Sequence, residues 1–246
     1  MRVSKKQTRQ HDRLMAMLSS SDRLSVDQIE SFYDDFVPSS MANTTKLNAF
    51  FTPQSVAQEI SVFCDCDGST VLDLAAGIGS LSYGILSSGR KPKRVVAIEI
   101  NPEFVKIGKR LLPEVEWICG DIFDATAMKR LGRFDWVISN PPFNVPMPPD
   151  VKKDAGPVTS DLAAVVVALT VANDGMFILP QKSTPWKFSG RQTYECSNPP
   201  TAVRRFMDRH PSINFYCVSC DLAYCKDDWQ DGITMPELVH ITNYTE

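Results

Sequence analysis

The sequence has no long hydrophobic run, which argues against a membrane-spanning protein. A helix that spans a bilayer needs about 20 consecutive apolar residues. The longest apolar run, residues 162–172, is roughly half that length. Residues 1–20 carry charge throughout and lack the apolar core of a secretory leader. The sequence therefore predicts a cytoplasmic protein with no membrane partner.

The chain also lacks an excess of positive charge. Its 26 lysines and arginines stand against 29 aspartates and glutamates, which gives a formal net charge of −3. Proteins that bind nucleic acid neutralise phosphates with lysine and arginine side chains. Any surface of that kind in this chain must therefore be local.

An even set of cysteines is missing as well. The seven cysteines are irregularly spaced, which is not typical of a disulfide framework. Cys217 and Cys220 have the CxxC spacing of many zinc sites, but they fall in residues 213–221, which we expect to form a strand. Residues i and i+3 of a strand point to opposite faces, so these thiols could not share one ion. We expect no bound metal.

Strand-like and helix-like segments alternate from residue 70 onward. This alternation is typical of an α/β fold with a doubly wound, mostly parallel, Rossmann-like sheet. We expect a seven-stranded sheet with an antiparallel C-terminal strand, preceded by N-terminal helices. The expected strands are residues 71–74, 94–99, 115–119, 134–139, 175–179, 213–221 and 237–242.

The segment before the sheet is predicted to be helical. Ser25 and Gln28 form a capping-box pattern, and Thr52-Pro53 is typical of the start of a helix. Residues 38–49 are polar and indicate a connector. We therefore divide the chain into an N-terminal helical extension, residues 1–49, and a main domain, residues 50–246.

A glycine-containing loop follows the first expected strand. It runs from Asp73 through Gly77 to Gly79 and opens a helix. Glycine allows a ligand to approach the backbone, and a helix N-terminus has unpaired N–H groups. Ser82 stands where the dinucleotide fingerprint G-x-G-x-x-G has its third glycine. Because the Asp73 carboxylate would repel a pyrophosphate, this loop favours a cationic amino-acid ligand.

Acidic residues also stand at the ends of the next two expected strands. Glu99 ends the second strand, where a carboxylate can accept hydrogen bonds from ribose hydroxyls. Asp121 follows the third strand and can accept from an adenine amino group, with Ile100 and Ile122 as apolar walls. Three acids at three successive strand ends indicate one nucleoside-binding edge.

This pattern resembles the class I methyltransferases that depend on S-adenosyl-L-methionine (SAM). The resemblance covers roughly residues 50–180 and makes residues 50–246 the expected catalytic domain. It implies SAM as the cofactor, with Glu99 at the ribose and Asp121 and Ile122 at the adenine. It places four loop residues along the methionine part of SAM: Asp73, Ala75, Gly77 and Gly79.

A second motif narrows the resemblance. Phe50-Phe51-Thr52-Pro53 looks like the motif that precedes the glycine loop in adenine-N6 DNA methyltransferases, where it packs on the methionine end of SAM. By this resemblance Phe51 and Thr52 join the cofactor site. The upstream helices are loosely similar to those of type I modification subunits, which implies a restriction-modification setting.

The tetrad Asn140-Pro141-Pro142-Phe143 follows the fourth expected strand. The prolines fix φ and remove two N–H donors. The Asn140 amide oxygen and the Pro141 carbonyl can each accept one N–H of a substrate amino group, which turns its lone pair toward the SAM methyl. Phe143 can stack on a base rotated out of its duplex. We expect these four residues to be catalytic, and Asn140 also to border the cofactor.

The tetrad specifies a planar amino or amide nitrogen. We predict methylation of adenine N6 in DNA. The alternatives are RNA adenine, a protein glutamine amide, or a SAM-binding subunit without turnover. Basic and aromatic residues suited to a nucleic acid strand occur at Lys182, Trp186, Lys187, Phe188 and Arg191. Because little chain remains for a target-recognition domain, we also expect a separate recognition subunit or a homodimer.

Overall fold

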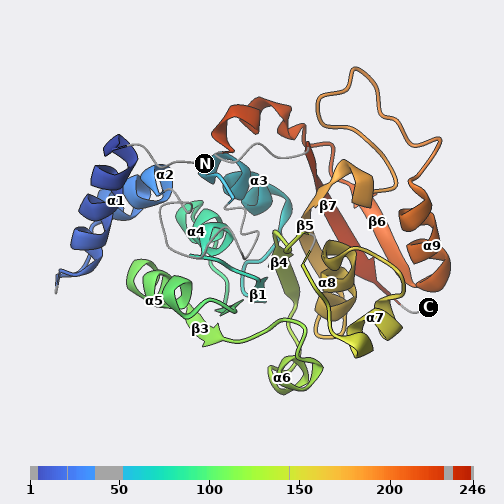
Figure 1. Cartoon of the computed structure of the whole chain (residues 1–246), viewed down its shortest axis with the longest axis horizontal. Coiled ribbons are helices and arrows are strands. Elements are labelled where there is room, and N and C mark those ends of the chain that lie inside the picture. Colours follow the sequence, from blue (N-terminus) through green and yellow to red (C-terminus); the bar gives the residue numbers. More distant parts are fainter. Residues whose placement is uncertain (1–4, 21, 37–51, 144, 230–234, 245–246) are drawn as a thin grey trace.

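Within the residues that the computed structural model describes (5–20, 22–36, 52–143, 145–229 and 235–244), seven strands form one mixed sheet (Figure 1). Its order is β3-β2-β1-β4-β5-β7-β6. Five strands run parallel: β1 (Thr70–Leu74), β2 (Arg94–Glu99), β3 (Glu116–Cys119), β4 (Trp136–Ser139) and β5 (Asp174–Pro180).

The C-terminal strand is inserted into the sheet in the opposite direction. Strand β7 (Pro236–Asn243) pairs antiparallel with β5 on one side and with β6 (Ile213–Cys217) on the other. The predicted doubly wound, mostly parallel sheet with an antiparallel C-terminal strand is confirmed. Strand order reverses between β1 and β4, and such a reversal opens a crevice at the carboxyl ends of the strands.

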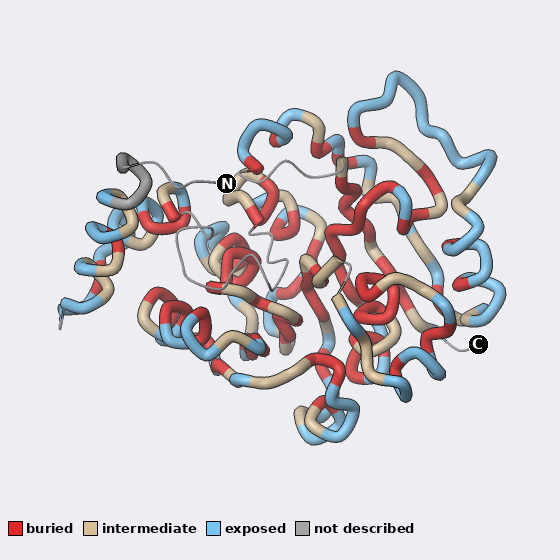
Figure 2. The backbone as a smooth tube through the Cα atoms, in the orientation of Figure 1, coloured by how far each residue is buried: buried red, intermediate tan, exposed pale blue. Residues whose placement is uncertain are grey.

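Alternating residues of the strands feed two hydrophobic clusters, one on each face of the sheet. Val71 belongs to the first cluster and Leu72 to the second. Because successive side chains of a strand point to opposite faces, most strands contribute to both clusters, whereas the edge strand β6 contributes only to the second. Figure 2 shows the buried strands at the centre of the molecule and exposed segments around them.

Helices cover both faces. The first cluster includes residues of α1 (Lys5–Leu18), α2 (Val26–Asp35), α3 (Gln54–Phe63), α4 (Ser80–Ser87) and α5 (Pro102–Leu111). The second includes residues of α6 (Ala125–Arg130), α7 (Pro149–Ala155), α8 (Ser160–Leu169) and α9 (Thr201–Arg209). The 3-10 helix η3 (Gln181–Ser183) follows β5, and the 3-10 helix η4 (Leu222–Asp228) lies between β6 and β7 in the sequence.

The N-terminal helices pack against the main domain. Leu14, Leu24 and Phe32 are buried in the first hydrophobic cluster. Arg110 of α5 donates to the carbonyl oxygens of Leu18 (3.2 Å), the last residue of α1, and of Ser20 (2.9 Å), which follows it. Figure 1 shows α1 and α2 beyond α4 and α5, on the side of the molecule away from α9. The predicted connector, residues 38–49, lies outside the described residues.

Some local expectations were wrong. The segment after the tetrad, residues 144–160, has the proline-rich composition of a loop, but it contains helix α7 (Pro149–Ala155). Strand β6 ends at Cys217, four residues before the expected end, so Cys220 is not on a strand. Cys220 is buried instead, with its Sγ 3.4 Å from the Glu59 carboxylate. Across the described ranges, no cluster of metal-ligating side chains occurs. No helix there is long and apolar enough to cross a membrane.

Candidate active site

A cavity of about 290 Å³ opens at the carboxyl ends of the parallel strands. Its volume is close to the lower end of the range for ligand pockets, about 300–1,000 Å³. Most of the residues predicted from the sequence line it: Thr52, Asp73, Ala75, Gly77, Glu99, Ile100, Asp121, Ile122 and all four of Asn140, Pro141, Pro142 and Phe143.

Of the predicted cofactor residues that the structure describes, Gly79 does not line this cavity. Phe51 lies outside the described residues. Gly79 is the N-cap of α4, in the left-handed region at φ 89°. A Cβ at this position would lie 3.0 Å from two ring atoms of Trp117. Gly79 is therefore explained by the turn and by the close approach of Trp117.

The loop before α4 has an unusual backbone. Ala75 and Gly77 both have φ near 59°. A non-glycine residue with positive φ is uncommon, and such residues cluster at ligand sites. The Ala76 N–H donates to the Ile98 carbonyl of β2 at 3.0 Å, which ties the loop to the neighbouring strand. Ala75, Ala76 and Gly77 all line the cavity.

Asp73 is completely buried at the end of β1. Its Oδ2 accepts hydrogen bonds from the Ser82 backbone N–H (3.1 Å) and the Ser82 hydroxyl (2.7 Å). Its Oδ1 has no hydrogen-bond partner among the described residues. Burial raises the pKa of Asp73 to about 7; the two bonds from Ser82 oppose this shift and the charge of Glu99 adds to it. The two hydrogen bonds from Ser82 thus stabilise the ionised form of the Asp73 carboxylate.

Glu99 organises the cavity edge from β2. Its Oε2 accepts from the Gly77 N–H at 2.9 Å, and its Oε1 accepts from the Asn101 N–H at 2.8 Å. Burial raises its pKa, against the hydrogen bonds from the backbone N–H groups of Asn101, Gly77 and Ile100. A carboxylate has about four acceptor positions, so Glu99 can still accept a hydrogen bond from a hydroxyl of a ligand.

Asp121 lies at the third strand end, after β3. Its Oδ1 accepts from the Phe123 N–H at 2.8 Å, which holds the turn. Ile122 is buried and Ile100 is 53% exposed, so the two apolar walls differ in their access to solvent.

Seven cavity residues were not predicted: Ala76, Ser80, Leu81, Phe104, Phe123, Val145 and Pro146. Most of these are apolar and carry no motif signal.

The tetrad begins directly after β4. Ser139, the last strand residue, donates its hydroxyl to the Leu74 carbonyl of β1 at 2.6 Å. Asn140 Nδ2 donates to Thr52 Oγ1 at 3.0 Å. Thr52 and Asn140 come from two separate motifs, and this hydrogen bond brings them together. An amide that donates through Nδ2 holds its Oδ1 on the opposite side of the group.

Ser160 at the start of α8 supports the chain after the tetrad. It is buried, its hydroxyl donates to the Pro142 carbonyl at 2.8 Å, and its Oγ accepts from the Val145 N–H at 3.1 Å. The sequence analysis missed this residue. A serine at the first position of a helix is too common to have indicated the contact.

One predicted nucleic-acid surface needs correction. Trp186 is only 4% exposed, so its ring is not available for stacking on a base. The backbone of Lys187 forms an isolated antiparallel β-bridge with that of Glu195. The buried Glu237 carboxylate of β7 accepts from the Phe188 N–H (2.7 Å) and the Gln181 side chain (2.8 Å). These hydrogen bonds to Glu237 therefore anchor the segment to β7.

The strand order, the glycine loop and the acids at the strand ends define the class of protein. They describe a Rossmann-like methyltransferase fold with its cavity at the switch point between β1 and β4. Comparisons with known proteins agree, because residues 71–156 match the family model described as a methyltransferase domain.

A curated relative is 35% identical over 83 residues, which are 33% of this chain and 30% of the relative. It is assigned as ribosomal RNA small subunit methyltransferase A of Methanosphaera stadtmanae. The chain thus matches 30% of the length of this relative and 40% of the length of a second curated relative.

Two solved structures show the same fold. One is the modification subunit assigned to a type I restriction enzyme of Vibrio vulnificus, with a TM-score of 0.60 and 12% identity over 89% of this chain and 50% of that one. The other is an O-methyltransferase of Bacillus cereus in complex with SAH, with a TM-score of 0.51 and 12% identity over 97% and 99% of the two chains.

These findings indicate SAM as the cofactor, and the matched domain supports a SAM-dependent methyltransferase. The cavity fits that molecule on its own chemistry. Asp73 Oδ1, a buried carboxylate oxygen without a partner in the described part of the chain, suits a cationic amino group. Glu99 and Asp121 add acceptors for hydroxyl and amino groups at the same cavity.

Proposed function

We propose that this protein transfers a methyl group from SAM to the N6 amino group of adenine in DNA. One observation carries the proposal. The tetrad lines the same cavity as Asp73, Glu99 and Asp121, and the side chain of Asn140 is oriented there by Thr52. Methyl donor and acceptor sites would therefore be adjacent.

The chain's acids would hold the cofactor. SAM supplies an electrophilic methyl group when it is bound. We propose that Asp73 faces its ammonium group, Glu99 its ribose hydroxyls and Asp121 its adenine amino group. Ile100, Ile122 and the loop from Ala75 to Gly77 would form the walls, and Phe51 and Thr52 would border its methionine end.

The tetrad would activate the substrate by position. Its prolines have no N–H, so the turn offers acceptors and excludes competing donors. With Nδ2 bound to Thr52, the Asn140 Oδ1 is held in one orientation and can accept an N–H of the substrate. The Pro141 carbonyl would accept the second N–H. Preorganised acceptors of this kind contribute several kcal/mol to a transition state, on the order of 3 kcal/mol each.

The choice of adenine in DNA is supported by resemblance. The Phe50–Pro53 segment is similar to a motif of adenine-N6 DNA methyltransferases, and the fold is shared with a protein assigned as a type I modification subunit. Phe143 lines the cavity beside Asn140, where a flipped base could stack on its ring. We propose residues 50–246 as the catalytic domain, with a separate recognition subunit or a second copy supplying target recognition.

The second candidate is adenine in RNA. It is favoured by the curated relative whose name refers to ribosomal RNA. A protein glutamine amide and a SAM-binding role without turnover have no comparable support from the comparisons.

Labelled methyl transfer tests the proposal. The full chain is incubated with methyl-labelled SAM and, separately, with duplex DNA, single-stranded DNA, RNA or a protein extract, and the labelled product is identified by mass spectrometry. We expect N6-methyladenine in DNA. Asn140→Ala should lower the rate on the order of 100-fold. Asn198→Ala, an exposed asparagine far along the chain, should leave it unchanged.

The outcomes separate the candidates. Label confined to RNA or to protein would overturn the DNA assignment and leave SAM-dependent transfer in place. SAM binding without transfer to any of the four substrates would favour a non-catalytic subunit. A full rate in Asn140→Ala would remove the proposed role of the tetrad.

A further inference from the structure

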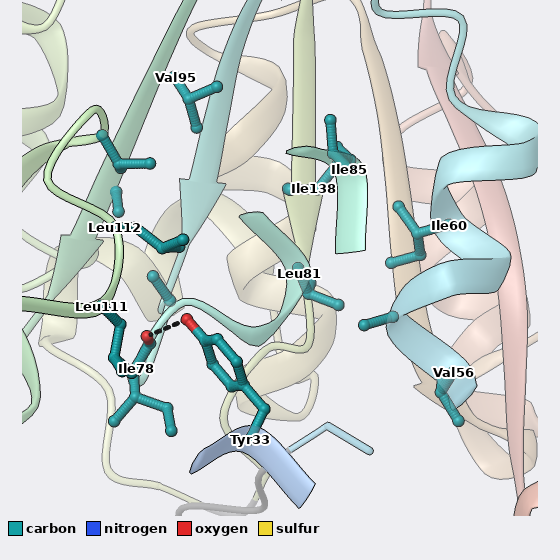
Figure 3. Close-up of a cluster of buried hydrophobic side chains, with 14 of the residues drawn as sticks. Tyr33, Val56, Ile60, Ile78, Leu81, Ile85, Val95, Leu111, Leu112 and Ile138 are labelled. Carbon is teal, nitrogen blue, oxygen red and sulfur yellow. Dashed lines mark hydrogen bonds between the residues drawn. The ribbon is translucent and has the colours of Figure 1, made fainter. Parts of the chain in front are cut away.

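Tyr33 of the N-terminal extension is in direct contact with the proposed SAM-binding loop. Its hydroxyl donates to the Ile78 carbonyl at 3.1 Å and lies 3.4 Å from the Gly79 carbonyl (Figure 3). Tyr33 is 9% exposed and stands 45 positions before Ile78 in the sequence. Figure 3 shows the ring entering a cluster of buried aliphatic side chains that includes Leu81 and Leu111.

The segment that Tyr33 contacts has a non-helical backbone, closed by a hydrogen bond from the Gly79 N–H to the Ala76 carbonyl at 2.8 Å. Ile78 is flanked by Gly77 at φ 59° and Gly79 at φ 89°, so neither neighbour has helical backbone geometry. A chain in this conformation depends on outside partners to hold it. On the cavity side, Glu99 accepts the Gly77 N–H. On the core side, Tyr33 binds the Ile78 carbonyl. Two adjacent residues are thus held from opposite directions.

The contact is well suited to persist. The Tyr33 ring stacks on Tyr83 of α4, with centroids 4.5 Å apart and planes at 19°. Burial raises the pKa of Tyr33 well above its ordinary value, and the charge of Asp73 raises it further. The hydroxyl therefore stays protonated and remains a hydrogen-bond donor at physiological pH.

The position of Tyr33 in turn depends on the extension as a whole. Arg110 binds the carbonyl oxygens of Leu18 and Ser20 at the end of α1, and Leu14 and Leu24 are buried in the same cluster as Tyr33. Among the residues that the structure describes, those that line the cavity lie at or after Thr52. Tyr33 would thus act on the cavity through the loop.

We propose that Tyr33 is a positioning residue for SAM binding, which links the N-terminal extension to the affinity of the cavity for its cofactor. The inference rests on the cofactor part of the proposed function and is independent of the identity of the methyl acceptor. By this inference, loss of the Tyr33 hydroxyl lets the Gly77–Gly79 backbone relax, so that the cavity binds SAM less tightly.

Tyr33→Phe tests this inference, because it removes only the hydroxyl and keeps the stacked ring. The affinity of the full chain for SAM, and separately for SAH, is measured by isothermal titration calorimetry. We expect the Kd to rise about tenfold, as for loss of a hydrogen bond that leaves a buried carbonyl unpaired. Tyr83→Phe makes the same chemical change on the neighbouring ring and should leave the Kd within about twofold.

A second control separates positioning from stability. Leu14→Ala truncates a buried side chain of α1 and lowers stability without touching the loop. We expect it to lower the unfolding temperature more than Tyr33→Phe does, and to weaken SAM binding less. An unchanged Kd in Tyr33→Phe, or a larger rise in Leu14→Ala, would overturn the inference. Tight SAM binding by the wild type without methyl transfer to DNA would overturn only the proposed acceptor.

Discussion

At the scale of single residues, Asp73 is unusual because it is a fully buried acid with one carboxylate oxygen without a partner in the described chain. Its pKa is about 7, above the value of about 3.9 expected in an unfolded chain. The contribution of Asp73 to stability is therefore fully present below pH 4 and is lost as the pH rises through about 7. A cationic ligand reverses this penalty by pairing with the carboxylate.

SAM affinity should consequently depend on pH. Between pH 6 and pH 7 the ionised fraction of Asp73 rises about fivefold, so we expect the Kd for SAM to fall by a similar factor. Calorimetric titrations across this range measure the effect. Asp73→Asn should flatten the profile, whereas Asp150→Asn, which changes an exposed acid of α7, should keep it. A pH profile that survives Asp73→Asn would rule out this residue as the titrating group.

At the scale of elements, helices α3 and α4 are in contact through their backbones. A Cβ at Gly84 of α4 would lie 2.5 Å from the Ala57 carbonyl oxygen of α3. Helix α4 begins at the glycine loop, and α3 begins two residues after Thr52, which orients Asn140. The close packing of these two helices therefore positions the cofactor loop relative to the tetrad.

Gly84→Ala should push the two helices apart. Alanine favours a helix over glycine by about 1 kcal/mol, but overpacking costs about 1–3 kcal/mol, and here the clash is with backbone. We expect a lower free energy of unfolding in urea and slower methyl transfer. Ser87→Ala, on the exposed side of α4, should change stability by less than about 0.5 kcal/mol. Equal stability of Gly84→Ala and the wild type would show that the helices can separate freely.

At the scale of the whole molecule, the net charge of −3 requires nucleic-acid contacts to be local. Helices α7 and α9 each carry two exposed basic residues suited to such contacts, Lys152 and Lys153 on α7 and Arg204 and Arg205 on α9. Arg209 of α9 joins them by donating to the Lys153 and Asp154 carbonyls at 2.5 and 3.1 Å. Helix α7 begins three residues after Pro146, which lines the cavity.

Replacing both Lys152 and Lys153 with glutamine should weaken nucleic-acid binding uniformly across sequences. Each lost phosphate contact should reduce the slope of log K against log salt concentration by about 1. Fluorescence anisotropy at several salt concentrations measures this slope. The matched control replaces Lys91 and Lys93, which precede β2 at the other end of the sheet. The same slope in both double variants would place the binding surface elsewhere.

The motif residues of the cavity could be predicted because their signals are local. Asp73, Glu99 and Asp121 each stand at the end of an apolar strand segment, and parallel strands bring their carboxyl ends to one edge. Trp186 was predicted wrongly, and helix α7 was not predicted, for a related reason. The basic and proline-rich composition of these segments indicates exposed loops, but contacts with β7 and α8 determine their structure.

The sequence by itself determined the alternation of strands and helices, the order of the motifs and the nature of the proposed cofactor. The tertiary structure alone decided which of these residues touch. Thr52 and Asn140 are 88 positions apart, Tyr33 and Ile78 are 45 apart, and Pro142 and Ser160 are 18 apart. Periodicity and turn chemistry act over a few residues, whereas these contacts arise from how the helices pack on the sheet, which no short segment encodes.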